Sequence, residues 1–413
     1  MKAEIQKGMG DKMDIIIVAQ YMGNVAELNA GNSRFFYIAK MLKQMGHKVE
    51  ILTSDFCHEK KSHFGKINRS EDIAITTCHE KGYSRNVCLN RFVSHRELAK
   101  NIERYLLKRP VPDVIYCAIP SIDVSAVAAK YCEKQQVKFI VDIQDLWPEA
   151  FKLVMKIPII NDLVFYPMTR KINYVYSVAD EIVAVSQTYV DRGLAVNKKC
   201  NQGHAVFLGT ELSRFDNYSD NIKKEMSIIK LAYCGTLGHS YDLKSTFDAL
   251  KMLADQHVPY EFVVMGDGPL MSSFKEYVNR LDLNVVFTGR MPYPKMVKRL
   301  SQCDICINPI MHGAAQSIIN KHADYVAAGK PIISTQESEE WRQLIDSYNM
   351  GINCRNGAPE EIEKAIYKLT MDEELRTRMG LNARRCAEEK FDRAITYKEI
   401  VDTIIKSKKR KMK

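Results

Sequence analysis

The chain has 413 residues, too many for one hydrophobic core and suited to two domains of roughly 200 residues each. Apolar residues make up 46% and charged residues 27%, which is ordinary for a soluble globular protein. No apolar stretch approaches the roughly 18–20 residues that a membrane-spanning helix needs, and the polar start argues against a secretory signal. Met13 is a candidate for the true start, because residues 1–12 have the composition of an unstructured leader.

The formal net charge of +10 admits three kinds of anionic partner: nucleic acid, membrane and substrate. We expect no nucleic acid, because no basic helix carries interleaved aromatic residues and no nucleic-acid-binding module is recognisable. The basic tail at 404–413 either touches a membrane surface or is a solvated end, and the sequence leaves both interpretations open.

Eleven cysteines are dispersed without the spacing of a disulfide framework, which is typical of reduced thiols in a cytosolic protein. Cys303 and Cys306 form a CxxC, but no second pair lies nearby to complete a zinc site. His58 and His63 stand in a polar loop, where solvated side chains are a simpler interpretation than metal ligands. These residues therefore predict no metal site.

Short apolar runs alternate with amphipathic helical stretches in the first half of the chain, which predicts a parallel α/β sheet. A helix is expected from about Arg34 to Met45, closed by Gly46, a residue favoured at helix C-termini. Ser94 and Glu97 have the spacing of a capping box and predict the start of a second helix. Strands are predicted at 14–20, 48–54, 72–77, 113–119, 138–143, 181–186 and 204–209.

A second series of the same kind follows a polar connector at 213–227. Its strands are predicted at 229–235, 260–266, 284–289, 304–309, 331–335 and 351–355, and residues 373–409 are expected to be helical.

The expected fold class is α/β, with two Rossmann-like domains facing one another across a cleft. Such open sheets bind ligands at the carboxyl ends of their strands. We expect an N-terminal domain at 13–212, a C-terminal domain at 228–390, and a C-terminal helix with a basic tail at 391–413 that returns to the N-terminal domain.

The segment Gly266–Asp267–Gly268–Pro269 stands directly after a predicted strand and before a predicted helix. Glycines at this junction let the backbone approach a ligand and present N–H groups to it. A tight turn between strand and helix explains the same residues without a ligand. A single GxG leaves both interpretations open.

The stretch 317–333 predicts a helix that starts at Asn320 and Lys321 between two strands. The dipole and free N–H groups of a helix N-terminus favour an anion such as a diphosphate, and Lys321 adds a positive charge there. Asp324 lies one turn further on, where it is placed to accept hydrogen bonds from ribose hydroxyls. A capped helix with solvated Lys and Asp side chains is the alternative.

Several motifs resemble, in order and spacing, those of family 4 retaining glycosyltransferases, over roughly residues 13–400. AYCGTLG, VVMGDGPL, VVFTGRMPYPKMVKRLSQCDICINP and NKHADYVAAGKPII resemble the family's donor-binding domain. GNSRFFYIAKMLKQMGHKVEILTS, VDIQDLWPEAF, EIVAVSQ and VFLGTELSRF resemble its acceptor domain. The resemblance is nearest to bacterial members that build capsular polysaccharide, exopolysaccharide or O-antigen, and it implies the GT-B architecture.

The resemblance also implies a donor site in the C-terminal domain. Residues 267–269 then lie near the base and ribose, and Asp324 stands where the family has the second Glu of its E-x7-E motif, the ribose binder. Lys321 holds the diphosphate, and Arg290 assists it. The implied donor-binding residues are Gly31, Asn32, Gly266, Asp267, Gly268, Pro269, Arg290, Ser317, Asn320, Lys321 and Asp324.

The chain departs from the family pattern at four positions. Gln316 replaces the first Glu of E-x7-E, and Gln144 replaces a His of the acceptor domain. Thr236 and Tyr241 correspond to the usual Arg and Lys that follow the strand in YCG. These departures leave Lys321 with more of the phosphate binding.

The mechanism implied by the resemblance is retaining transfer without a bound metal and without a required cofactor. The helix dipole and Lys321 stabilise charge on the leaving nucleoside diphosphate, whose phosphate oxygen serves as base for the acceptor hydroxyl. The candidate catalytic residues are Asp145, Gln144 and Gln316, which orient the acceptor or contact the sugar. A turn-capping role for Asp145, before Pro148, stays open as the alternative.

The expected partners are a nucleotide-sugar donor, with UDP favoured by family habit, and a lipid-linked or polysaccharide acceptor. The stretch 151–178 mixes apolar residues with lysines and arginines, and such a surface suits an acceptor held in an anionic membrane. Two helices packed on the domain with solvated lysines explain it equally. We expect a cytoplasmic protein, at the inner face of the cell membrane if the first interpretation holds.

Two other functions remain open on the sequence. One is a nucleotide-sugar-binding partner subunit that has lost catalysis, which the neutral residues Gln316, Gln144 and Thr236 favour. The other is a nucleotide-sugar 2-epimerase, which needs acidic and His groups near the sugar that this sequence does not obviously supply.

Overall fold

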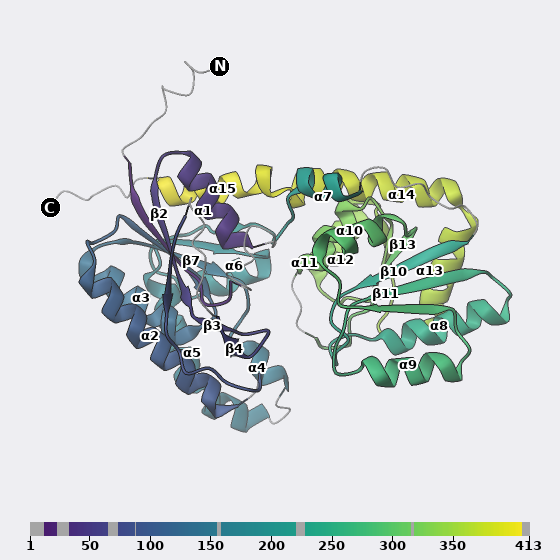
Figure 1. Ribbon diagram of the computed structural model, residues 1–413, viewed down its shortest axis with the longest axis horizontal. Helices are drawn as coiled ribbons and strands as arrows, with labels where there is room; N and C mark the ends of the chain where they lie inside the picture. Colours follow the sequence, from purple (N-terminus) through teal and green to yellow (C-terminus); the bar gives the residue numbers. More distant parts are fainter. Residues whose placement is uncertain are drawn as a thin grey trace, which may run out of the picture. The chain divides into compact units, whose positions relative to one another are not determined.

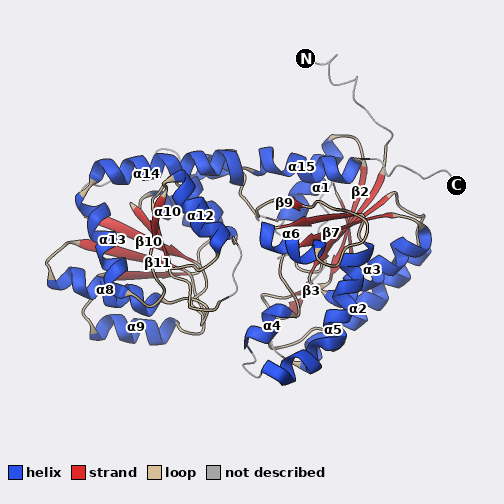
Figure 2. Cartoon of the chain, turned by 180° about the vertical axis from the view of Figure 1, so that it is seen from behind, coloured by secondary structure: helices blue, strands red, loops and turns tan. Residues whose placement is uncertain are grey.

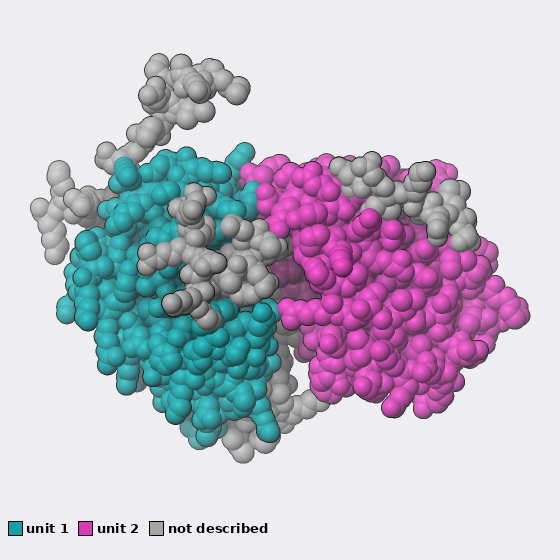
Figure 3. Space-filling view, viewed as in Figure 1, with its two compact units in different colours: residues 1–206, 397–413 teal, residues 207–396 magenta. Residues whose placement is uncertain are grey.

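The computed structural model describes residues 12–22, 33–64, 73–86, 88–154, 158–219, 228–314 and 318–406. The chain divides into two compact units (Figure 3). Unit 1 consists of residues 1–206 and 397–413, and unit 2 consists of residues 207–396.

Unit 1 is built on a seven-stranded sheet in the order β5-β2-β1-β6-β7-β8-β9, and every neighbouring pair is parallel. The central strands are almost wholly buried, because helices cover both faces of a parallel sheet. The strands are β1 (Asp14–Val18), β2 (Lys48–Ser54), β5 (Ala74–Cys78), β6 (Val114–Ile119), β7 (Lys138–Ile143), β8 (Glu181–Ala184) and β9 (His204–Ala205).

Helices α1 (Arg34–Gln44) and α15 (Arg393–Ile405) lie on one side of this sheet, and α2, α3 and α5 lie on the other (Figure 1). The core on the first side joins apolar residues of β1, β2 and β6 to those of α1 and of α15 from Tyr397 onward. A small antiparallel hairpin, β3 (Phe56–Cys57) with β4 (Ser62–His63), follows β2. The remaining helices are α2 (Leu89–Lys108), α3 (Ile122–Gln135), α4 (Glu149–Val154), α5 (Pro158–Val178) and α6 (Gln187–Leu194).

Unit 2 has a six-stranded parallel sheet in the order β12-β11-β10-β13-β14-β15. Its strands also lie between helices (Figure 2), with one apolar core on each face. The strands are β10 (Ile229–Cys234), β11 (Tyr260–Met265), β12 (Val285–Gly289), β13 (Ile305–Asn308), β14 (Ile332–Ser334) and β15 (Gly351–Asn353). The helices are α7 (Leu212–Ser219), α8 (Leu243–Asp255), α9 (Met271–Arg280), α10 (Tyr293–Ser301), α11 (Asn320–Ala327), α12 (Glu339–Tyr348), α13 (Pro359–Met371), α14 (Glu373–Cys386) and η3 (Ala387–Phe391).

The α/β class with two parallel sheets is confirmed, and each predicted strand is present within a few residues of its predicted bounds. In each sheet the first strand of the unit lies in the interior. The strands that come next in the chain are added on one side of it and the later strands on the other, so the strand order reverses between β1 and β6 and between β10 and β13. In open sheets of this kind the crevice at the carboxyl ends of the strands is the usual ligand site.

The predicted start of the second helix at Ser94 is wrong. Helix α2 begins at Leu89, and Ser94 is buried in its interior. The hydroxyl of Ser94 donates to the Glu80 carboxylate and accepts from the backbone N–H of Gly82, 2.8 Å away. Ser94, whose spacing to Glu97 resembles a capping box, therefore takes part in a network of tertiary hydrogen bonds.

Two boundaries also differ from those expected. The first unit ends at Val206 and not at residue 212, because Leu212 and Phe215 are buried in the core of unit 2. The helical end is interrupted at Asp392, between η3 and α15, and the division between the units falls inside α15, after Thr396.

No helix among the described residues combines the length and the apolar composition needed to cross a membrane. None of the eleven cysteines, all of which lie within the described residues, forms a disulfide, and Cys303 and Cys306 are both buried in the core of unit 2.

Unit 1 contains a buried ion pair between the first helix and the centre of the sheet. Nε of Arg34 lies 2.8 Å from Oδ2 of Asp142, and neither side chain has appreciable exposure. Tyr116 donates to the same carboxylate oxygen at 2.6 Å, and Nη1 of Arg34 donates to the carbonyl of Val206 at 2.9 Å. Arg34 lies two residues after Asn32, which the family resemblance implies as a donor-binding residue, yet the guanidinium of Arg34 is engaged inside the fold.

Replacing Asp142 with Ala should lower the free energy of unfolding by about 3–5 kcal/mol, because Arg34 is then left as an uncompensated buried charge. Urea unfolding would measure the change. The matched control is Lys48→Ala. Nζ of Lys48 is exposed and lies 2.9 Å from Oδ2 of Asp14, so its removal should lower the free energy of unfolding by less than about 1 kcal/mol. An equal loss of unfolding free energy in the two variants would contradict a stabilising role for the buried ion pair.

Candidate functional site

Two loops at the carboxyl edge of the unit 2 sheet pack closely against one another. The backbone N–H of Leu237, after β10, donates to the carbonyl of Asp267, after β11, at 2.9 Å. A Cβ atom at Gly266, where φ is +156°, would lie 1.8 Å from the carbonyl oxygen of Gly235. A Cβ atom at Gly268 would lie 2.4 Å from the carbonyl oxygen of Leu237. Both glycines are therefore required by the close approach of the two loops, whether or not a ligand lies above them.

The side chains of this turn point outward. Asp267 and Pro269 are exposed, and Oδ1 of Asp267 accepts from the N–H of Gly268 at 2.7 Å. Arg290 follows β12, the next strand of the sheet, and is also exposed. These predicted donor-binding residues thus lie at one edge of the sheet.

Helix α11 begins at the same edge, after β13. Asn320 is its first residue and is exposed, whereas the three residues that follow it are buried. Lys321 is the second residue, and it is 7% exposed. The predicted helix start is therefore where the sequence places it.

The ammonium group of Lys321 lies among aromatic rings. Its Nζ is 4.1 Å from the centre of the Tyr241 ring and 5.1 Å from that of Tyr233, and the two rings meet edge to face. Within the described part of the chain this Nζ has no hydrogen-bond partner. Burial lowers the pKa of Lys321 well below its usual value. A lysine amine that is buried against aromatic rings, with no hydrogen-bond partner among the described residues, is an unusual arrangement, and an anion at the helix N-terminus would relieve it.

A buried polar network supports the start of α11 from behind. The ring of His322 accepts from the backbone N–H of Ile319 at 2.8 Å through Nδ1, and its Nε2 lies 2.8 Å from Oε1 of Gln336. Asn308 donates to that same oxygen and to Ser334, at 3.0 Å each. Burial lowers the pKa of His322 to about 3, so the ring is neutral near pH 7.

The sequence analysis did not identify this network. Its one local signal was a histidine in the first turn of a helix, directly after Lys321. Its other members are Asn308 on β13, Ser334 at the end of β14 and Gln336 after β14, and only the pairing of those strands brings them together.

Asp324, the expected ribose ligand, is buried. Oδ1 of Asp324 accepts from the hydroxyl of Tyr293 at 2.8 Å, and that hydroxyl lies 3.0 Å from Oγ1 of Thr210. Burial raises the pKa of the Asp324 carboxyl to about 7. The structure therefore gives Asp324 protein partners, and its contact with a ribose stays a prediction. Gly31, Asn32, Gln316 and Ser317 lie outside the described residues.

In unit 1, Gln144 and Asp145 follow β7 at the carboxyl edge of the sheet. Nε2 of Gln144 donates to Oδ1 of Asp142 at 2.6 Å, so its amide is held by the buried ion pair. Oδ2 of Asp145 accepts from Nε1 of Trp147 at 3.0 Å, and burial raises the pKa of Asp145. This hydrogen bond agrees with the turn-stabilising alternative for Asp145.

Next to Asp145 lies a cluster that the sequence analysis missed, formed by Tyr21, Tyr83, Arg91, His95 and Trp147, here called the aromatic cluster. The Arg91 guanidinium lies 4.5 Å from the Trp147 ring and within 6 Å of both tyrosine rings.

Hydrogen bonds join the members of the aromatic cluster. Nη2 of Arg91 donates to the Tyr21 hydroxyl at 3.1 Å, and that hydroxyl lies 2.9 Å from Nε2 of His95. Burial lowers the pKa of His95 to about 3. Nε of Arg91 has no hydrogen-bond partner within the described residues. The available sequence signal was the i, i+4 spacing of Arg91 and His95, which places both on one face of α2.

Comparison with known proteins agrees with this description. Residues 229–372 match the protein family described as Glycosyl transferases group 1. An uncharacterized glycosyltransferase of Methanocaldococcus jannaschii is 26% identical over 233 residues, which cover 54% of this chain and 58% of that protein. A second uncharacterized glycosyltransferase of that organism is 22% identical over 217 residues, with 52% of this chain and 57% of that protein covered. The alignments thus span just over half the length of these curated relatives.

Solved structures resemble the chain over nearly its whole length. HepE from Anabaena, in complex with UDP-glucose, has a TM-score of 0.67 at 15% identity, with 95% of this chain and 99% of HepE covered. WaaG, a glycosyltransferase involved in lipopolysaccharide biosynthesis, has a TM-score of 0.66 at 13% identity, with 95% and 99% covered. The chain therefore has the two-domain α/β fold of GT-B glycosyltransferases, and its second unit contains a region similar to group 1 glycosyl transferases.

Proposed function

We propose that the chain is a glycosyltransferase and that its donor, a nucleotide-sugar, binds at the carboxyl edge of the unit 2 sheet. The observation that carries this proposal is the buried ammonium of Lys321, which has no hydrogen-bond partner among the described residues and lies at the N-terminus of α11. A diphosphate supplies the missing anion to both the ammonium and the helix N–H groups. The similarity of residues 229–372 to group 1 glycosyl transferases supports the same region.

The finer features of the proposal rest on the resemblance and on the neighbours. We propose UDP as the nucleotide, since HepE was solved with UDP-glucose. We propose a lipid-linked or polysaccharide acceptor, retention of configuration and a role in bacterial surface polysaccharide synthesis, to which the description of WaaG lends support. No bound metal or other cofactor is part of the proposed reaction, and the proposed location is the cytoplasm.

The proposed chemistry assigns charge stabilisation to Lys321 and the N-terminus of α11. As the bond between sugar and phosphate breaks, negative charge grows on the leaving nucleoside diphosphate, and fixed positive groups stabilise it. Tyr241 occupies the position of a family lysine, and here it covers the ammonium of Lys321. Shielding by the two tyrosine rings keeps that ammonium poorly solvated, so its attraction for a phosphate is stronger than that of an exposed lysine.

For the acceptor we propose the carboxyl edge of unit 1, at Asp145 and the aromatic cluster. Aromatic rings offer apolar faces to a sugar or lipid carrier, and Nε of Arg91 offers a hydrogen bond that no described residue uses. Asp145 lies beside them through its bond to Trp147, where it can orient an acceptor hydroxyl.

A binding subunit without catalysis is the second candidate, and one observation favours it. Gln144, which replaces a family histidine, is neutral and is held by Asp142. Donor binding without transfer or hydrolysis of the nucleotide-sugar would support this candidate over the transferase.

Replacing Lys321 with Met should stabilise the free protein and abolish its response to nucleotide. The free energy of unfolding should rise by about 1–4 kcal/mol, as when other buried ionic groups are replaced by apolar side chains. Native protein at about 100 times the dissociation constant of UDP should gain about 2.7 kcal/mol, and Lys321→Met should gain nothing at that concentration. Denaturation with and without UDP or UDP-glucose measures both effects.

Lys244→Met is the matched control for that experiment. Lys244 also lies over a tyrosine ring of unit 2, 5.4 Å from the centre of Tyr277, but it is exposed. Its variant should keep the native response to UDP. A Lys321→Met protein that UDP still stabilises as strongly as the native protein would contradict the placement of the diphosphate.

Replacing Asp145 with Asn keeps an acceptor for Trp147 and removes the carboxylate charge. If Asp145 orients the acceptor, turnover should fall roughly 10- to 100-fold while the melting temperature stays near native. Transfer assays with UDP-sugar and a polyprenyl-linked acceptor would measure kcat. Asp191→Asn, at an exposed site on α6, is the control. Unchanged turnover in Asp145→Asn would leave Asp145 with its turn-stabilising role alone.

Helix α5 carries exposed apolar side chains that suit contact with a membrane surface. Leu163, Val164 and Tyr166 are 80%, 53% and 62% exposed, and Arg170 is exposed one turn further on. We propose that this part of α5 docks on the membrane that holds a lipid-linked acceptor.

Leu163→Asp should therefore weaken co-sedimentation with vesicles that contain anionic lipid, by about tenfold or more, because burying a leucine is worth about 1.5–3 kcal/mol. Leu381→Asp, at a leucine of unit 2 that is 69% exposed, should leave co-sedimentation unchanged. Sedimentation that depends neither on anionic lipid nor on Leu163 would speak against membrane docking.

A further inference from the structure

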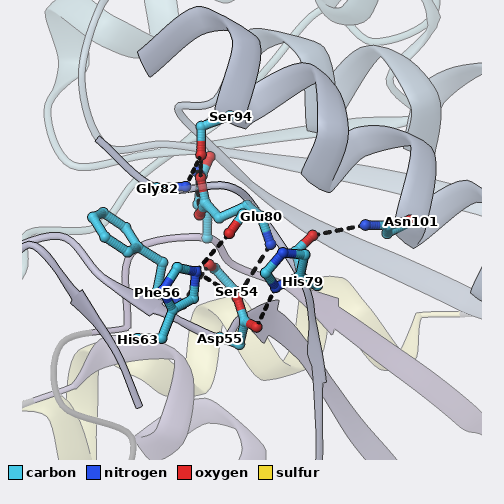
Figure 4. A network of polar contacts seen from close by, with 10 residues as sticks. Ser54, Asp55, Phe56, His63, His79, Glu80, Gly82, Ser94 and Asn101 are labelled. Atoms are coloured by element: carbon cyan, nitrogen blue, oxygen red, sulfur yellow. Dashed lines mark hydrogen bonds and ion pairs between the residues drawn. The ribbon is translucent and has the colours of Figure 1, made fainter. Parts of the chain in front are cut away.

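Three side chains with metal-binding chemistry converge at one corner of unit 1. Asp55 directly follows β2, His63 ends the β3–β4 hairpin, and His79 directly follows β5. Because β2 and β5 are parallel neighbours, Asp55 and His79 leave the sheet at the same edge, and the hairpin folds back over them. Figure 4 shows the three side chains directed toward one another beside Glu80.

The distances between their ligand atoms fit a single ion. Nδ1 of His79 is 2.7 Å from Oδ2 of Asp55, and Nε2 of His63 is 3.7 Å from Oδ1 of the same carboxylate. One ligand atom from each residue can be chosen so that all lie within 4.8 Å of one another. Zinc binds histidine nitrogen and carboxylate oxygen at about 2.0–2.2 Å, so two ligands of one ion are separated by about 3–4 Å. Among the described residues this is the one group of three or more such side chains that meets the criterion.

Neighbouring groups hold two of the ligands in place. The backbone N–H of Glu80 donates to Oδ1 of Asp55 at 3.1 Å, and the carbonyl of His79 accepts from Nδ2 of Asn101 at 2.8 Å. The Phe56 ring packs edge-on against His63, and the imidazoles of His63 and His79 stack at 5.3 Å. Supporting contacts of this kind orient the side chains that coordinate the ion in metal sites.

We propose that Asp55, His63 and His79 bind a divalent first-row transition-metal ion such as Zn²⁺. Two imidazoles and one carboxylate are ligands typical of these ions and leave positions for water or a further oxygen. His63 now has its Nε2 at 2.7 Å from the carbonyl of Glu80, and this nitrogen would give up that contact to ligate the ion. The freed carbonyl oxygen then lies beside the ion as a candidate fourth ligand.

The proposed ion fixes the β3–β4 hairpin to the ends of two sheet strands. All three ligands belong to unit 1, and none is a residue that the proposed transfer chemistry uses. The site departs from the sequence-based expectation of no metal and of a solvated His63. It does not make the transfer reaction metal-dependent, and its test needs no transferase activity.

The test uses the full chain, stripped with a chelator and titrated with Zn²⁺ by calorimetry and with Co²⁺ by visible absorption. We expect one ion per chain and a cobalt spectrum without the near-ultraviolet sulfur-to-metal charge-transfer band, which separates this site from the eleven thiols. Zinc should also raise the melting temperature of the native chain. His63→Ala, His79→Ala and Asp55→Asn should each weaken binding about tenfold or more.

The matched control is His204→Ala, in the same unit. Nδ1 of His204 is also 2.7 Å from a carboxylate, that of Glu399, but the second carboxylate, that of Glu181, faces the opposite ring nitrogen at 3.9 Å, so the ligands do not converge. This variant should bind zinc as the native chain does. The ligand variants should match the native melting temperature without metal, since their side chains are partly exposed. Failure of the native chain to bind one zinc ion, or native affinity in all three ligand variants, would overturn the proposal.

Discussion

The structure depends on one constraint, that every strand in both large sheets runs parallel to its neighbours. Parallel strands need crossover helices, and those helices bury both faces of each sheet. The central strands are consequently rich in apolar residues, and most of the polar groups of the candidate sites lie at or near the ends of strands. At the carboxyl edges the turns lead into helices, so glycine loops, helix N-termini and the residues that follow each strand collect there.

Lys321 shows what this arrangement contributes in unit 2. The strand order brings β10 beside β13, so the tyrosines of the β10 strand and loop cover a lysine from the helix after β13. Burial disfavours the charged form of that lysine, and a bound phosphate would favour it. The contacts within the protein therefore stabilise the charged form of Lys321 less than the proposed anion would. This is a common feature of sites that stabilise the charge that develops during a reaction. The His322 network holds the start of α11 by hydrogen bonds to Ile319 and Gln336.

In unit 1 the same kind of edge carries three different groups of residues. Asp142 lies near the end of β7 and holds Arg34, which ties α1 to the centre of the sheet. The aromatic cluster lies beside the turn that follows β7, and the proposed metal ligands lie beyond β2 and β5. Glu80 joins the last two regions, because it follows His79 and accepts hydrogen bonds from Gln20 and Ser94. Glu80 therefore lies between the proposed metal ligands and the chain neighbours of Tyr21 and His95.

The sequence by itself determined the class of fold, the bounds of most strands and the start of α11 at Asn320 and Lys321, because these follow from apolar periodicity and local turn chemistry. It misplaced the start of α2, since Ser94 and Glu97 match a capping box locally while Ser94 serves a buried contact with Glu80. Only the tertiary structure decided that Asp324 is buried against Tyr293, that Arg91 lies among aromatic rings, and that Asp55, His63 and His79 converge. The members of each group lie on several different elements, and the packing of those elements, which no local pattern encodes, brings them together.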